Sequence, residues 1–130
     1  MQIGVLGGTG PAGSGLAARL ASAGFDVVIG SRSKYRALEA RDKLVAKWES
    51  LDLPLSAGDN ETAAGSDIVV VATPWDAAAA TVAEVAPSLR GKVVISMANA
   101  LAKVGHEFQP LVPPRGSVAA SVQAAVPKSL

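Results

Sequence analysis

The sequence predicts an α/β protein with a doubly wound parallel β-sheet, about five strands in the order 3-2-1-4-5 with helices on both faces. Apolar runs rich in β-branched residues recur along the 130 residues, and stretches with a helical pattern separate them. Helical connections make the neighbouring strands parallel, because a parallel pair needs a long crossover. A glycine cluster follows the first of these runs. We expect the main strands at Ile3–Leu6, about residues 26–30, Asp67–Ala72 and Lys92–Ser96.

The glycine cluster reads Gly8-Thr9-Gly10-Pro11-Ala12-Gly13 and joins the first strand to an Ala/Leu-rich helix that ends at Gly24. This is the strand–turn–helix context of a dinucleotide-binding fingerprint and of a Rossmann-type fold. Gly8 would allow the turn, Gly10 would let backbone N–H groups approach a pyrophosphate, and Gly13 would let the helix pack near the strand. A steric glycine turn without a ligand is the alternative, and the second apolar run at βαβ distance argues against it.

The end of the second strand indicates which nicotinamide cofactor fits. An NAD-selective fold places Asp or Glu there, and Asp26 lies at the wrong end of the strand. Ser31 and Arg32 occupy the position instead, with Arg36 close behind. A hydroxyl and a guanidinium suit a 2′-phosphate, so we expect NADP(H) rather than NAD. The alternative is a solvated helix start, but positive charge at a helix N-terminus favours an anion.

The middle of the chain predicts a helix over residues 34–50, a short edge strand and a short helix. Leu38, Leu44, Val45 and Trp48 are available for the apolar face of the long helix. Leu53–Ser56 is the candidate third strand, and its proline suits an edge position. Residues 59–64 can form one or two helical turns closed by Gly65.

Two loops follow the last predicted strands at the carboxyl edge of the sheet, where open α/β sheets bind ligands. Thr73 and Pro74 are candidates to line the ribose and nicotinamide; equally, the proline can begin the next helix and Trp75 can cover its base. That helix should span about residues 76–86 and end at Pro87. Asn99 is the only amide in the second loop, and it can bind cofactor or stabilise the turn.

Composition excludes several other classes. Lys+Arg 12 against Asp+Glu 11 gives a net charge of +1 without a basic run, so nucleic acid is not an expected partner. The chain has no Cys and one His, so we expect no metal site, and no apolar segment reaches membrane-spanning length. We therefore expect a cytoplasmic protein. His106 is interpreted as a surface residue, no acid–base pair is recognisable, and we name no catalytic side chain.

The motifs together resemble the NADPH-binding portion of the NADPH-dependent deazaflavin-coenzyme reductases. The segments that carry the resemblance are Gly7–Ala17, Val28–Arg32 and Thr73-Pro74-Trp75. The resemblance implies hydride transfer between NADP(H) and coenzyme F420, a small-molecule acceptor or donor. It also implies that Thr9, Ser31 and Arg32 hold the 2′-phosphate with Arg36 as a further contact, and that backbone around Gly10, Pro11 and Ala12 meets the pyrophosphate.

Members of that family continue through a sixth strand and a helical segment that completes the deazaflavin site. Here an amphipathic stretch with Val118, Val122 and Val126 on one face leads to Leu130, and we expect the sixth strand to be missing. Residues 1–130 are accordingly interpreted as an NADP-binding domain, truncated before the family's C-terminal segment. The hypotheses are an NADP-dependent oxidoreductase and a non-catalytic NADP(H)-binding module that needs a partner or the missing segment for turnover. The exposed sheet edge favours a homodimer.

Overall fold

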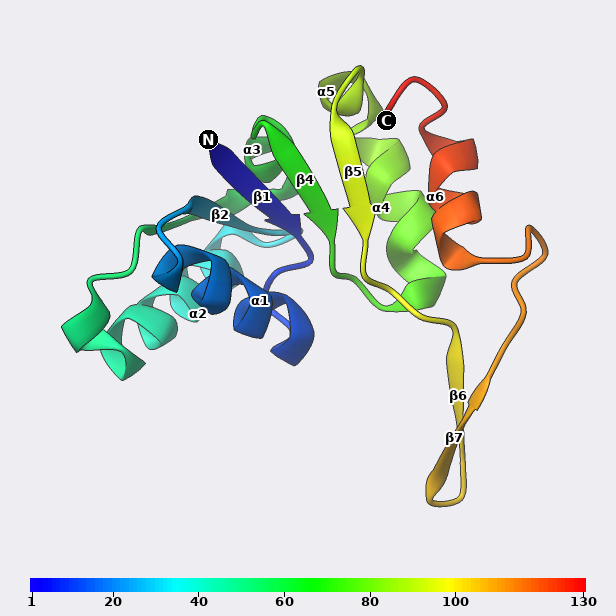
Figure 1. Ribbon diagram of the computed structural model, residues 1–130, viewed down its shortest axis with the longest axis horizontal. Coiled ribbons are helices and arrows are strands. Elements are labelled where there is room, and N and C mark those ends of the chain that lie inside the picture. The colour runs from blue at the N-terminus through cyan, green and yellow to red at the C-terminus, as the bar shows by residue number, and fades with distance from the viewer.

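The computed structural model describes residues 1–130 and contains a five-stranded parallel sheet in the order β3-β2-β1-β4-β5. The predicted doubly wound fold is confirmed (Figure 1). β1 lies at the centre, where Gly4 is paired with Val28 on one side and with Val69 on the other. The strands are β1 (Gln2–Leu6), β2 (Asp26–Ser31), β3 (Leu55–Asp59), β4 (Ile68–Val71) and β5 (Val93–Ser96).

Helices cover both faces of the sheet, and alternate strand residues face the two sides. Val5, Val27 and Ile29 pack on one face against α1 (Pro11–Ser22) and α2 (Lys34–Lys47). Leu6, Val28 and Val69 pack on the other face, against a larger group of helices. These helices are α3 (Asn60–Ala64), α4 (Ala78–Glu84), α5 (Ala86–Leu89) and α6 (Val118–Ala125), and the 3₁₀ turn η2 (Trp75–Ala77) precedes α4. A second 3₁₀ turn, η1 (Glu49–Leu51), follows α2.

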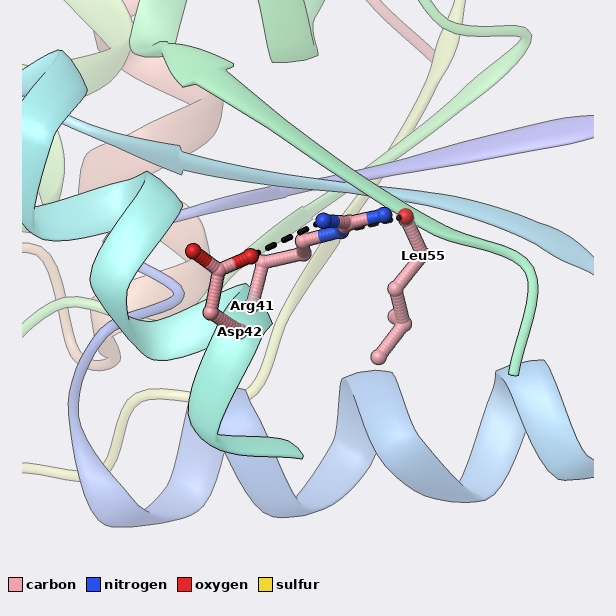
Figure 2. Close-up of polar contacts among 3 residues, drawn as sticks. All are labelled: Arg41, Asp42 and Leu55. Carbon is pink, nitrogen blue, oxygen red and sulfur yellow. Dashed lines mark hydrogen bonds and ion pairs between the residues drawn. The ribbon is translucent and has the colours of Figure 1, made fainter. Parts of the chain in front are cut away.

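The third strand begins later than predicted. Leu53 and Pro54 precede β3, although the Pro54 carbonyl already accepts a hydrogen bond from the Val27 N–H at 3.0 Å. Proline has no N–H to donate to a ladder, so the regular strand starts after it, at Leu55. Arg41 of α2 donates from Nε to the Leu55 carbonyl at 3.1 Å and forms an ion pair with Asp42 at 2.8 Å (Figure 2). Arg41 thereby gives a partner to a carbonyl on the edge strand.

Two helix predictions are partly wrong. α2 ends at Lys47, and its predicted apolar face is incomplete because Leu38 and Trp48 are 37% and 43% exposed. The helix predicted over residues 76–86 starts as a 3₁₀ turn at Trp75 and breaks at Val85. Pro87 does not end it but lies in the first turn of α5, where its missing N–H has no intrahelical partner to lose.

A β-hairpin that the sequence reading did not predict follows β5. β6 (Leu101–Val104) and β7 (Glu107–Pro110) are antiparallel and project away from the sheet (Figure 1). The hairpin turn contains Gly105, at φ 62°, and His106, which is exposed as expected.

The end of the chain lies against β5. The Leu130 N–H donates to the Lys92 carbonyl at 2.7 Å, and the Val94 N–H donates to the Leu130 carbonyl at 2.9 Å. These two bonds are those of a parallel bridge between Leu130 and Val93. α6 packs on α4 through Val118 and Val122, which confirms the amphipathic stretch. No helix of the structure combines the length and hydropathy needed to cross a bilayer.

Candidate functional site

A cavity of about 610 Å³ lies over the carboxyl ends of β1, β2 and β4. Its walls come from the β1–α1 turn, the β2–α2 connection, the start of α3 and the segment from the end of β4 into α4. These segments are far apart in sequence, and the order of the parallel strands brings them to one edge. Seven predicted site residues line this cavity: Thr9, Gly10, Ser31, Arg32, Arg36, Thr73 and Pro74.

The three positions of the fingerprint differ in why they carry glycine. A Cβ on Gly8 would lie 3.0 Å from Ile29 Cγ2, and a Cβ on Gly13 would lie 2.9 Å from the Gly8 Cα. Packing therefore accounts for both. Gly10 differs, because its φ of −73° and ψ of 168° suit any residue and a Cβ there would meet nothing within 4 Å. Protein packing does not account for Gly10, but close approach of a ligand would.

The N-terminus of α1 has unpaired donors next to the cavity. Gly10 is the N-cap residue and offers no side-chain cap, Pro11 has no N–H, and the first turn contains no acidic side chain. The remaining first-turn N–H groups, including that of Ala12, are free for an anion, and the helix dipole favours one. Gly8, Pro11, Ala12 and Gly13 form this turn without lining the cavity themselves.

The end of β2 and the start of α2 contribute a hydroxyl and two guanidinium groups. Ser31 is 7% exposed, and its Oγ accepts from the Ser33 N–H at 3.2 Å, which leaves its own proton free to donate. Ser33 caps α2 by accepting from the Arg36 N–H at 3.4 Å. Arg32 and Arg36 are exposed and have no carboxylate partner, since the two ion pairs of the structure involve other residues. This wall can bind an anion with several charge-assisted hydrogen bonds.

The segment after β4 forms the opposite wall. Thr73 lies so close to Gly7 that a Cβ on this glycine would come within 2.6 Å of the Thr73 Cγ2. Thr73 Oγ1 donates to the Pro74 carbonyl at 3.1 Å, and Trp75 is half-buried against the core. Asn99 does not join these residues: it lines a separate hollow of about 330 Å³ between the end of β5, the hairpin and the start of α6.

The sequence reading missed Gly7 and Asn60. Gly7 has a φ of 67°, which the pair of consecutive glycines before Thr9 could have signalled only weakly. Asn60 is 7% exposed and lines the cavity from the start of α3. Asp59 caps this helix by accepting from the Thr62 N–H and Oγ1 at 2.8 and 2.7 Å. These hydrogen bonds, led by that of the Thr62 side chain, lower the pKa of Asp59.

Residues 2–100 match the model of a protein family described as coenzyme F420-dependent NADP oxidoreductases. The chain is 38% identical over 128 residues to the F420-dependent NADP reductase of Methanocaldococcus jannaschii, a match that covers 95% of the chain and 57% of that protein. It is 42% identical over 96 residues to the enzyme of the same name from Methanothermobacter marburgensis, covering 73% and 43%. The chain thus spans about half the length of these relatives.

Two solved structures have folds similar to that of this chain. A protein from Arthrobacter sp. FB24, provisionally assigned as an F420-dependent NADP reductase, has a TM-score of 0.76 and 28% identity over 98% of this chain and 59% of its own. The lactate dehydrogenase of Cryptosporidium parvum, solved with lactic acid and NAD, has a TM-score of 0.64 and 16% identity, with 97% and 41% covered. The second likeness shows only the fold.

Proposed function

The chain belongs to the coenzyme F420-dependent NADP oxidoreductase family, and on that premise we propose that residues 1–130 form an NADP(H)-binding domain of an oxidoreductase that exchanges hydride with a deazaflavin coenzyme. The observation that carries the proposal is that one cavity joins two unpaired anion-binding places. These are the uncapped N-terminus of α1 and the guanidinium groups of Arg32 and Arg36. NADP carries phosphate at two separated positions, whereas NAD carries it at one.

The pyrophosphate is proposed to lie against the first turn of α1, over the open space at Gly10. Backbone N–H groups around Gly10, Ala12 and Gly13 would hold it, with Gly8 supporting the turn and Pro11 fixing the helix start. No side chain fills this space, which supports close approach of a ligand's oxygens to the backbone.

The 2′-phosphate is proposed to lie between Ser31, Arg32 and Arg36, with the Thr9 hydroxyl on the side of the glycine turn. One charge-assisted hydrogen bond contributes about 1.5–3 kcal/mol, so two such contacts favour NADPH over NADH by at least about a hundredfold. Thr73 and Pro74 line the same cavity, so we assign them to the adenosine half of the cofactor. Asn99 is assigned to the nicotinamide side, at the end of β5.

NADPH supplies two electrons and a proton as hydride when it is bound. This chain would contribute by positioning the cofactor. α1 and the β2–α2 connection would fix its adenosine end, so that the nicotinamide reaches the sheet edge near the carboxyl ends of β4 and β5. No side chain of the cavity is assigned to proton transfer.

The test is NADPH oxidation by the purified chain with F420 supplied, followed through the absorbance of both cofactors. We expect F420-dependent oxidation of NADPH, slow NADH oxidation, and no turnover when F420 is omitted. Riboflavin serves as a control acceptor that has the same ring outline but a nitrogen at the hydride-accepting position. Tight NADPH binding without turnover would contradict the oxidoreductase and leave an NADP(H)-binding module.

We also propose that the chain forms a homodimer through the part of the β5 edge that Leu130 leaves unpaired. Val93 and Ile95 are 42% and 49% exposed on this strand, which supports a contact that covers them. Light scattering should give a dimer mass for the native chain and a monomer mass for Ile95→Lys. A native chain that stays monomeric at high concentration would contradict this proposal.

A further inference from the structure

Asn60 is the only buried amide side chain over the carboxyl edge of the sheet, and only one end of it has a protein partner. Asn60 is 7% exposed, and its Oδ1 accepts from the Gly7 N–H at 3.3 Å. Only the amide oxygen can accept this bond, so the chemistry fixes the orientation and Nδ2 points the other way. Buried amide groups normally have partners at both ends.

The Nδ2 group of Asn60 has no hydrogen-bond partner in the protein, yet it is not sealed in the interior. Ser96 Oγ is the one fully buried side-chain oxygen or nitrogen without a partner, so Nδ2 keeps access to open space. The space that Asn60 borders is the cavity of about 610 Å³. Two N–H donors on a largely buried side chain therefore open into that cavity.

Two neighbouring glycines locate the Asn60 amide group at the edge of the sheet through its oxygen. The Oδ1 bond places the amide beside Gly7, at the turn proposed for the pyrophosphate. A Cβ on Gly30 would lie 3.0 Å from Asn60 Oδ1, so the amide also lies beside the end of β2, where the 2′-phosphate region begins at Ser31. The group of the nucleotide that connects these two phosphates is the adenosine ribose.

We propose that Asn60 is a cofactor-binding residue whose Nδ2 donates a hydrogen bond to the 3′-hydroxyl oxygen of the adenosine ribose, while its Oδ1 holds the glycine turn. This inference rests on the proposed function, because it takes the cavity as the NADP site. In NADP the 2′-oxygen carries the extra phosphate and the 5′-oxygen carries the pyrophosphate. The 3′-hydroxyl is thus the one free hydroxyl of that ribose, and it lies between the two phosphate positions.

The test compares adenosine 2′,5′-bisphosphate with its 3′-deoxy analogue by titration calorimetry on the full chain. Wild type should bind the 3′-hydroxyl compound about tenfold more tightly, since removal of the hydroxyl leaves a desolvated donor unpaired. Asn60→Ala should bind both compounds with nearly equal affinity. Damage to the glycine turn weakens both ligands together and cancels in this ratio. Thr81→Val is the matched control, because Thr81 is 8% exposed and lines the same cavity from α4; it should retain the wild-type ratio.

A second readout does not depend on any variant folding. In ¹⁵N-asparagine-labelled wild type, the Asn60 side-chain amide protons should shift when adenosine 2′,5′-bisphosphate binds and shift much less with the 3′-deoxy analogue. Equal affinities in wild type, or an Asn60→Ala ratio that stays near tenfold, would overturn the assignment and leave Asn60 a support for Gly7. Failure of wild type to bind NADPH at all would sink the proposed function itself, which is a separate outcome.

Discussion

The pair of substitutions Gly10→Ala and Gly13→Ala separates the needs of the ligand from the needs of the fold. At Gly10 the backbone suits alanine and the new Cβ meets nothing within 4 Å. Alanine is a poorer N-cap than glycine, but it also lowers the entropy of the unfolded chain, so the free energy of unfolding should change by less than about 0.5 kcal/mol. The methyl group would occupy the space proposed for the pyrophosphate, and NADPH affinity should fall at least about tenfold.

At Gly13 the expectation for stability is the reverse. The new Cβ would lie 2.9 Å from the Gly8 Cα and 3.1 Å from both the Ala72 Cβ and the Gly7 carbonyl oxygen. Two of these three neighbours are backbone atoms, so α1 must move away from the turn. Overpacking of this kind costs about 1–3 kcal/mol. For a chain of this size the melting temperature should fall by about 3–12 °C.

Thermal unfolding followed by circular dichroism without ligand, and then NADPH titration followed by fluorescence, measure the two effects separately. Gly15→Ala is the control within the same helix, because a Cβ there also meets nothing within 4 Å and Gly15 does not line the cavity. It should leave NADPH affinity unchanged. A Gly10→Ala variant that melts as low as Gly13→Ala, or that binds NADPH as tightly as the wild type, would refute the separate roles of the two glycines.

Three further predictions concern the cofactor, acid stability and the core. Arg32→Glu should lower the ratio of NADPH to NADH affinity by about a hundredfold or more, because a carboxylate repels the 2′-phosphate; an unchanged ratio would place the phosphate elsewhere. Because hydrogen bonds to Thr62 lower the pKa of Asp59, the stability that its carboxylate contributes is complete above about pH 4 and is lost as the pH falls below that. Thr62→Val should therefore raise the pKa of Asp59 in an NMR titration and weaken the acid dependence of unfolding. No change in this pKa would contradict the assigned cause. Val122→Ala, on the buried face of α6, should cost about 2 kcal/mol in urea unfolding and spare NADPH affinity, and a loss of affinity would show that α6 supports the cavity.

The strand order could be predicted because the apolar runs and the glycine turn are local signals that agree with one another. The β6–β7 hairpin could not, since Phe108 is exposed and no alternation of buried and exposed residues marks these strands. Trp48 was available for the apolar face of the long helix, but it is the C-cap residue of α2 and stays 43% exposed, so it does not belong to the core.

Within the candidate site, many of the residues that the sequence indicated lie at or just after the carboxyl end of a strand, such as Ser31 and Thr73. Asn60 also follows a strand directly, but the predicted third strand ended at Ser56, too early to mark it. Its partner, Gly7, lies 53 residues away, and only the placement of α3 over the sheet brings them together. Asn99 follows a strand as well, yet the structure places it in another hollow, because the chain turns outward into the hairpin after β5. A position after a strand predicts the edge of the sheet, but not which cavity along that edge.

The central place of β1 has a consequence for the order of folding. β1 is synthesised first, but its partner on one side, β4, follows about 65 residues later. At typical translation rates of about 5–20 residues per second, that edge of β1 stays unpaired for roughly 3–13 seconds. Closing so long a loop also slows refolding of the whole chain, because the chain loses conformational entropy before the contacts of the parallel pair form. The edge proposed to receive the nucleotide can therefore be assembled only after β4 has joined the sheet, so NADPH should accelerate none of the steps before that event.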